Sequence, residues 1–255
     1  MIHKKKYLNL LRELAFTQYK LKDQSTFFGF MWSFLNPLIM LTVLFIFFRI
    51  RIGEGIEHYG IYLLIGIIQY THFANSTSAS MRVLRSMKNL TCNAIFPKEI
   101  LVIGSIISNT IEFIFSMIIC VIIAFFLGIK VSSSLIMLPL VILLQLMMVL
   151  WVSLLLSYLY VFVRDTDHLY QVFLRLLFFV TPTFYGLSFL GEGFAKNIVL
   201  LNPLTHLINF SRTIIIEGRF FSIELMLLFV LINSALIYFA FKIFKKFEPK
   251  FAEHL

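Results

Sequence analysis

Residues 163 to 189 read VRDTDHLYQVFLRLLFFVTPTFYGLSF, and this stretch opens with a cluster of polar side chains. Their types are ones that hold metal ions or move protons: Arg164, Asp165, Asp167 and His168. The same cluster suits a tight turn in which Asp165 or Asp167 caps the helix that follows. No H-E-x-x-H or nucleophile motif joins His168 to another histidine. We therefore predict a turn, with no catalytic residue and no metal site.

Two charged residues lie inside apolar runs. Glu112 lies about twelve residues, or about 18 Å, into one run, and Arg175 lies about seven residues, or about 10 Å, into another. A charge at such a depth costs roughly 2.5–3.5 kcal/mol on insertion scales, so each should face protein, water or a counter-charge. The two side chains could pair with each other, or Arg175 could snorkel toward the surface. The sequence leaves both arrangements open.

The composition places the chain in a membrane. Hydrophobic residues make up 60% of its 255 positions, against about 45–50% in soluble domains. The net charge of +9 fits membrane topology and attraction to anionic lipid, so no nucleic-acid partner is needed. The two cysteines, Cys92 and Cys120, are too few for a disulfide framework or a metal site. We predict an all-α membrane protein that forms one transmembrane domain over residues 1–255.

Six apolar windows approach the roughly 20 residues that a helix needs to cross a hydrocarbon core about 30 Å thick. The fifth is short, because its fifteen residues cover only about 22 Å. Fifteen of the 22 Lys and Arg residues lie in the terminal segments and in the connections on the same side, which predicts cytoplasmic termini. The six windows are 28–48, 61–81, 100–127, 135–162, 168–182 and 222–241.

Two segments on the predicted cytoplasmic side are amphipathic. Residues 1–27 place apolar and charged side chains on opposite arcs, which predicts a helix in the membrane interface in contact with lipid. Residues 84–97 predict a short helix that Pro97 ends. Its apolar side chains could dock on a protein partner or fold back on the bundle: Leu84, Met87, Leu90, Ile95 and Phe96.

The fifth window ends at TPTFYG. Pro182 removes a backbone donor, and Gly186 loosens the turn. Because irregular backbone survives at membrane depth only where protein or a water-lined cavity satisfies it, we predict that residues 183–221 hold re-entrant pieces. A second break is expected at Pro203, and residues 222–255 should form the last span and a cytoplasmic tail.

Five stretches, in this order and spacing, resemble the membrane subunits of ABC-2 type polysaccharide exporters. These bacterial permeases move lipid-linked O-antigen, teichoic acid or capsule chains. The resemblance covers nearly the whole chain and is carried by TFFGFMWSFLNPLIML, YLLIGIIQYTHFANS, NAIFPKEIL, FVRDTDHLYQVFLRLLFFVTPTFYGLS and LLNPLTHLINFSRTII.

The resemblance implies a half-transporter of the bacterial inner membrane. Two copies would form a channel, and two separate subunits would bind ATP and magnesium and hydrolyse the ATP. This chain contains no G-x-x-x-x-G-K-[ST] motif, since Gly55 and Gly60 are followed by Ile-Tyr. The resemblance also makes residues 84–97 the coupling helix that docks on the ATPase, and it implies an external gate after the fifth span, at Pro182, Gly186 and Pro203.

A lipid-linked polysaccharide calls for two kinds of contact. A guanidinium or ammonium could bind the pyrophosphate, with Arg175, Lys20, Lys22 and Arg82 as candidates. Aromatic rings can stack on sugar faces without demanding one pattern of hydroxyls, although each ring could equally pack against helices or lipid. The candidates for this path are Tyr70, Phe73, Phe178, Phe179, Phe184 and Tyr185.

Other functions compete with polysaccharide export. O-antigen is the favoured cargo, with teichoic acid or capsule as alternatives within the same family. A membrane-embedded transferase acting on polyprenyl-linked sugars would need carboxylates and histidines gathered on one face, and here they are dispersed. A small-molecule exporter of the ABC-2 type, or a plain channel, would share the same number of spans.

Overall fold

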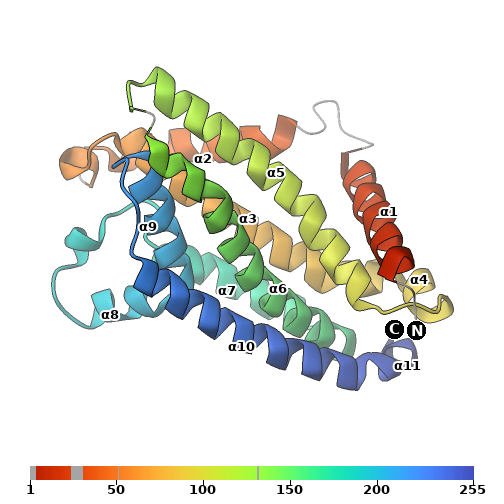
Figure 1. Ribbon diagram of the computed structural model, residues 1–255. Helices are drawn as coiled ribbons and strands as arrows, with labels where there is room; N and C mark the ends of the chain where they lie inside the picture. Colours follow the sequence, from red (N-terminus) through yellow and green to blue (C-terminus); the bar gives the residue numbers. More distant parts are fainter. Residues whose placement is uncertain (1–3, 24–30, 51, 131) are drawn as a thin grey trace.

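The computed structural model describes residues 4–23, 31–50, 52–130 and 132–255, apart from the side chains at 4, 21–23, 33 and 54. This part of the chain is helical and contains no strand, which confirms the all-α prediction (Figure 1). Short 3-10 turns connect several of the helices. The helices are α1 (Lys4–Asp23), α2 (Trp32–Phe48), α3 (Tyr59–Ser86), α4 (Lys88–Asn93), α5 (Glu99–Phe126), α6 (Leu138–Phe162), α7 (Thr166–Val180), α8 (Phe194–Leu201), α9 (Pro203–Ile215), α10 (Ile223–Phe247) and α11 (Phe251–His254).

Three helical stretches in the described residues are long and apolar enough to cross a membrane: Glu99–Phe126, Ser133–Phe162 and Ile223–His254. A fourth candidate is the pair α8 and α9, whose axes bend by 81° between Leu201 and Pro203. The α2 helix is apolar but short, and α7 has only 15 residues. The first and fifth predicted windows thus correspond to helices shorter than a full span.

The α3 helix forms the centre of the bundle and packs against α2, α5, α6, α7 and α9. Serines recur at a four-residue spacing on both α3 and α6, two helices that pack together: Ser76 and Ser80 on α3, Ser153 and Ser157 on α6. All four are fully buried. Small residues at this spacing are typical of helices that pack closely inside a membrane.

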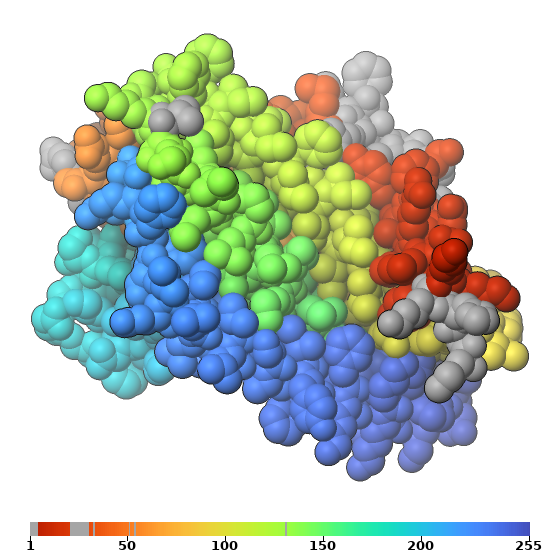
Figure 2. All heavy atoms as spheres, in the orientation of Figure 1, coloured from red at the N-terminus to blue at the C-terminus, as the bar shows by residue number. Residues whose placement is uncertain are grey.

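The ends of the bundle differ. The start of α1, together with α4 and α11, lies at one end, and α8 and α9 lie at the other (Figure 1). On the face shown in Figure 2, α10 lies beside α6 and α1 lies against α5. At the α1 contact, Gln18 Nε2 donates to the Leu101 carbonyl at 3.3 Å and lies so close to Gly104 that a Cβ there would be 3.3 Å away. Leu8 and Phe16 of α1 remain exposed.

The prediction of one helix over residues 84–97 was wrong in its boundaries. The α3 helix continues to Ser86, the six-residue α4 follows, and the chain is no longer helical from Ala94. Leu84 belongs to the buried face of α3 and is fully covered. Because Leu84 lies on the same buried face as the preceding apolar residues of α3, the helical periodicity of α3 extends through it, and no new helix begins there.

Candidate functional site

A groove of about 360 Å³ lies between α2, α3 and α7. It brings together four residues that the sequence analysis singled out for two different roles, namely Tyr70, Phe178, Phe179 and Arg175. Aromatic rings, side-chain amides and a guanidinium therefore share one surface. We call this the α3–α7 groove, and its lining is Met40, Tyr70, Ala74, Asn75, Ser78, Gln171, Leu174, Arg175, Phe178 and Phe179.

The rings of the groove are held in place by contacts behind them. The Tyr70 hydroxyl donates to the Leu174 carbonyl, which fixes its ring between α3 and α7. Phe178 packs edge-on against Tyr70 at 5.1 Å between centroids and against Phe179 at 5.6 Å. Phe179 stays 65% exposed. The groove thus has an exposed aromatic surface that a bound ligand could contact.

Polar groups line the groove beside the rings. Gln171 Nε2 donates to Ser78 Oγ at 3.3 Å, and Arg175 is exposed on α7. Glu112, the other charge in an apolar run, is buried within α5. Amides and a guanidinium can bind the hydroxyl and anionic groups of a sugar chain, while the rings stack on its faces. This combination suits a carbohydrate better than a purely apolar ligand.

Three of the predicted path aromatics lie elsewhere. Phe73 is buried in the main core, and Phe184 and Tyr185 are buried in a second cluster with Tyr59 and Leu63. These rings therefore pack helices together, which is the alternative role weighed for each aromatic residue. They are not part of the groove lining.

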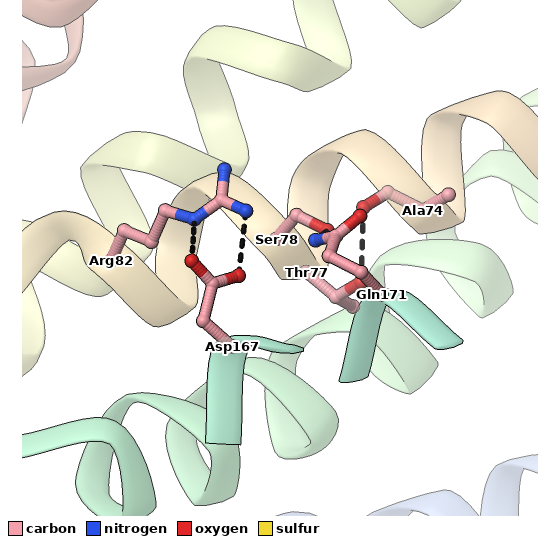
Figure 3. Close-up of polar contacts among 6 residues, drawn as sticks. All are labelled: Ala74, Thr77, Ser78, Arg82, Asp167 and Gln171. Atoms are coloured by element: carbon pink, nitrogen blue, oxygen red, sulfur yellow. Dashed lines mark hydrogen bonds and ion pairs between the residues drawn. The ribbon is translucent and has the colours of Figure 1, made fainter. Parts of the chain in front are cut away.

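A charged pair, which was not predicted from the sequence, joins the start of α7 to the last turns of α3 (Figure 3). Arg82 donates to both carboxylate oxygens of Asp167, from Nε at 2.9 Å and from Nη2 at 2.6 Å. The bonds from Arg82 hold the pKa of Asp167 below its usual value. Tyr170 extends the contact by donating to Thr77 Oγ1 at 2.6 Å. We call the Arg82–Asp167 pair the α3–α7 latch.

The predicted helix cap is not formed. Asp165 is the N-cap residue of α7, but its backbone is already helical and its side chain makes no capping bond. Asp167 lies in the first turn and binds Arg82 instead. Among the described residues, no group of three His, Cys, Asp or Glu side chains could hold a metal ion.

The candidate phosphate-binding cations are dispersed. Arg175 is in the groove, Arg82 is engaged by Asp167, and Lys20 is exposed on α1. The side chain of Lys22 lies outside the described residues. Only Arg175 therefore shares a surface with the aromatic candidates.

The α7 helix ends at Val180, two residues before Pro182, and the carbonyl groups that follow are all hydrogen-bonded. Each carbonyl from Phe179 to Gly186 accepts a hydrogen bond. Tyr59 donates to the Phe184 carbonyl at 2.8 Å, and Tyr62 donates to that of Tyr185 at 3.1 Å. Side chains from neighbouring helices thus replace the helical bonds that this segment lacks. We call residues 181–186 the break.

Arg212 on α9 is the central donor to the break, and it was not among the candidate site residues of the sequence analysis. It is 3% exposed. Its Nη1 donates to the Pro182 carbonyl and its Nη2 to that of Thr183, each at 2.8 Å. The same guanidinium reaches the Tyr62 carbonyl on α3 and lies 3.3 Å from the centre of the Tyr62 ring. The signal that could have identified Arg212 was its position as a charged residue within the largely apolar stretch 203–215.

Gly66 on α3 allows the break to approach this closely. A Cβ added there would lie 2.6 Å from the Thr183 carbonyl oxygen and 2.9 Å from its Cα. Gly186, by contrast, has an ordinary φ of −85°, and a Cβ there would meet nothing closer than 3.4 Å. The expectation that Gly186 loosens the turn is not supported, because its conformation is open to other residues.

The second predicted break coincides with the bend between α8 and α9. Pro203 occupies the first turn of α9, where no helical donor is needed. Asn202 accepts from the Leu204 backbone N–H at 3.0 Å and donates to Thr181 Oγ1 at 2.8 Å. The cap of α9 is thereby bonded to the end of α7, so the two breaks form one connected structure.

The candidate docking residues around α4 differ in exposure. Ile95 is completely exposed and Leu90 is 40% exposed. Met87 and Phe96 pack partly against the core, and Leu84 is buried. Among the five candidate docking residues, the exposed apolar side chains are therefore Leu90 and Ile95.

These features define a multi-pass integral membrane protein with a groove and a braced helix break. The chain belongs to the ABC-2 type transporter family, which matches residues 10–216. This membership makes it a transport protein rather than a sugar transferase.

The chain is also similar to individual transport proteins. It is 26% identical over 250 residues to an O-antigen export system permease protein RfbA of Myxococcus xanthus, with 98% of this chain and 96% of that protein covered. It is 24% identical over 237 residues to a protein of the same description from Klebsiella pneumoniae, covering 92% and 91% of the two chains.

Proposed function

We propose that this protein is the channel-forming subunit of an ATP-driven exporter of lipid-linked O-antigen in the bacterial inner membrane. The observation that carries this proposal is the α3–α7 groove, in which Tyr70, Phe178 and Phe179 share a surface with Arg175 and side-chain amides. The aromatic rings offer faces on which sugar rings can stack, and Arg175 offers a cation for a pyrophosphate. Relatives described as O-antigen permeases support the choice of cargo over teichoic acid or capsule.

The groove is open along one side of α7, so we propose that a second copy of the chain completes the channel. Apolar side chains flank it, including Ile39 and Val43 on α2 and Leu176 on α7, each at least 47% exposed. Exposed apolar surface beside a polar groove is suited to a protein partner as well as to lipid. A homodimer would enclose the two grooves in one conduit.

The proposed topology has six spans, formed by α2, α3, α5, α6, α7 and α10, with both termini in the cytoplasm. The α8–α9 pair would then be re-entrant from the external side, and the break would form part of an external gate. The 81° bend and the bonded carbonyls of the break support this arrangement, because irregular backbone at membrane depth needs protein partners.

The energy would come from two ATPase subunits that bind ATP and magnesium. They would dock on Leu90 and Ile95, at the end of the bundle that carries α4 and α11. Rigid-body movement of those subunits could then re-space the helices that border the groove.

Removal of groove rings tests the export proposal. In cells that lack the chromosomal copy, a Phe178→Ala/Phe179→Ala variant should restore much less surface O-polysaccharide than the unmodified chain. The matched control is Phe173→Ala, because Phe173 is 51% exposed on the same helix but is not part of the groove. Equal surface polysaccharide from the two variants, at equal membrane levels, would contradict the proposal.

A further inference from the structure

Two hollows meet along α10 at the end of the bundle remote from α4 and α11. One has a volume of about 490 Å³ and the other about 450 Å³. Both are lined by Leu200, His206 and Leu225, so they form one continuous groove, which we call the α10 groove. Each hollow falls within the range of about 300–1,000 Å³ that is usual for ligand clefts.

The first hollow is apolar and follows one face of α10 from Leu225 to Leu236. At 1.5 Å per residue this distance is about 16 Å, close to half of a hydrocarbon core about 30 Å thick. Three of its lining side chains carry polar groups, and all three are already bonded. His206 Nε2 lies 2.8 Å from the Leu200 carbonyl oxygen. Trp151 Nε1 donates to Asn233 Oδ1 at 2.9 Å, and Asn233 Nδ2 donates to the Phe229 carbonyl at 2.8 Å. Because this lining is mainly apolar and its polar groups are already bonded, it suits an acyl chain in one leaflet rather than a polar ligand.

The second hollow is lined by apolar and polar side chains together and carries both signs of charge. Arg219 Nη2 lies 2.7 Å from Glu217 Oε2, and their side chains are 74% and 44% exposed. The loop that bears them is fixed. Gly218 between them has a φ of +65°, its carbonyl accepts from Ser132 Oγ at 2.9 Å, and the Arg219 backbone N–H donates to Thr213 at 3.1 Å. Both charges therefore face the groove mouth from a rigid turn and can bind further groups.

We propose that the α10 groove binds one phospholipid with a primary-amine headgroup, its acyl chain against α10 and its headgroup at the Glu217–Arg219 turn. The guanidinium of Arg219 suits the phosphate oxygens. The carboxylate of Glu217 accepts hydrogen bonds from an ammonium group, whereas a trimethylammonium group has no N–H to donate. The headgroup therefore selects the lipid, since every bilayer lipid offers a similar acyl chain.

The site is separate from the α3–α7 groove, whose lining it does not share. It contacts α8 and α9 through Leu200 and His206, so the bound lipid would cover the outer side of the bent helix pair. In the proposed topology it belongs to the external leaflet. Its binding can be measured without transport activity.

Fluorescence of Trp151 tests the proposal on the full chain. The chain has two tryptophans, and a Trp32→Phe background leaves Trp151, which lines the apolar hollow, as the only reporter. The protein is reconstituted in phosphatidylcholine vesicles that contain a small fraction of phosphatidylethanolamine or phosphatidylcholine with brominated chains. We expect brominated phosphatidylethanolamine to quench Trp151 about two- to five-fold more per mole than brominated phosphatidylcholine does. A preference of this size corresponds to the free energy of contacts between exposed charges.

The variants separate headgroup recognition from folding. Arg219→Ala should abolish this preference while the protein still elutes as a single species. Lys196→Ala, which removes a partly buried lysine on α8 that pairs with Glu192 and lines neither hollow, should keep this preference. Equal quenching by the two brominated lipids in the parent, or an unchanged preference in Arg219→Ala, would overturn the proposal. Relief of quenching by a polyprenyl phosphate but not by unbrominated phosphatidylethanolamine would also overturn it, because the groove would then bind the carrier lipid.

Discussion

The guanidinium of Arg212 on α9 donates to the carbonyl oxygen of Thr183 in the break at 2.8 Å. Two helices and a non-helical segment meet at this bond, since the same side chain also reaches Pro182 and the Tyr62 carbonyl on α3. The cost of burying a guanidinium is offset when its donors are occupied in this way. The contact therefore links α3, α9 and the break into one unit.

Arg212→Ala should destabilise the protein strongly. Each buried carbonyl left without a donor costs about 1–3 kcal/mol, so the loss of several should lower the thermal midpoint in detergent well below that of the parent. Arg212→Lys should be intermediate, because an ammonium cannot span all three acceptors. Arg219→Ala is the control, as Arg219 is 74% exposed. A midpoint for Arg212→Ala equal to that of the control would show that the bonds contribute little.

Gly66→Ala should disturb the break without changing any charge. Its new Cβ would lie 2.6 Å from a backbone oxygen, a contact that cannot be relieved by rotating a side chain. We expect reduced surface polysaccharide and a lower thermal midpoint. Gly60→Ala on the same helix is the matched control, since its Cβ would meet only a Phe45 ring carbon at 3.7 Å. Similar behaviour of the two variants would argue against close packing at Gly66.

Charge reversal tests the α3–α7 latch. Exposed ion pairs contribute about 0.2–1 kcal/mol to stability, and Arg82 is 45% exposed. Arg82→Asp or Asp167→Arg alone should therefore lower the stability of the protein only slightly, and should reduce polysaccharide export by a larger factor. The double exchange, Arg82→Asp with Asp167→Arg, should recover much of the export. No recovery would indicate that the two positions act independently.

The latch should not respond to pH in the physiological range. Arg82 lowers the pKa of Asp167 from 3.8, so the pair contributes fully above that value and is lost only as the pH falls through the lower pKa of the folded state. The difference in thermal midpoint between the parent and Asp167→Asn should thus be the same at about pH 6 and about pH 8. A difference that shrinks between these values would mean that another group titrates at the latch.

Leu90→Asp and Ile95→Asp should weaken attachment of the ATPase subunit while the chain still inserts. Both side chains are exposed, so a charge there need not disturb the fold. Leu84→Ala should instead lower the thermal midpoint, because Leu84 is buried in α3 and its truncation leaves a cavity. Undiminished co-purification of the ATPase with both aspartate variants would show that docking occurs elsewhere.

The sequence predicted features that depend on local composition. The end of α7 near Pro182 and the break at Pro203 follow from helix chemistry and bilayer thickness. Tyr70, Phe178, Phe179 and Arg175 were each singled out, but their meeting in one groove was not predicted. Features that depend on packing between distant helices were not predicted. Arg212 gained its role from carbonyls about 30 residues away, and Asp167 bonded to Arg82 on another helix instead of its own N-terminus.

Phe73, Phe184 and Leu84 were misplaced for a related reason. An aromatic or aliphatic side chain in a membrane helix can face lipid, core or a conduit, and sequence spacing alone does not distinguish these surroundings. Their burial depends on where α3 lies relative to its neighbours, which spacing along the sequence does not give.

Four of the six carbonyl groups of the break, those of Pro182, Thr183, Phe184 and Tyr185, accept hydrogen bonds from side chains on α3 and α9. Tyr59 and Tyr62 belong to α3, and Arg212 belongs to α9. The conformation of the break consequently depends on the distance between those two helices. Any movement that separates α3 from α9 would strip several carbonyls of their donors together, so this segment should switch between arrangements abruptly rather than bend by degrees.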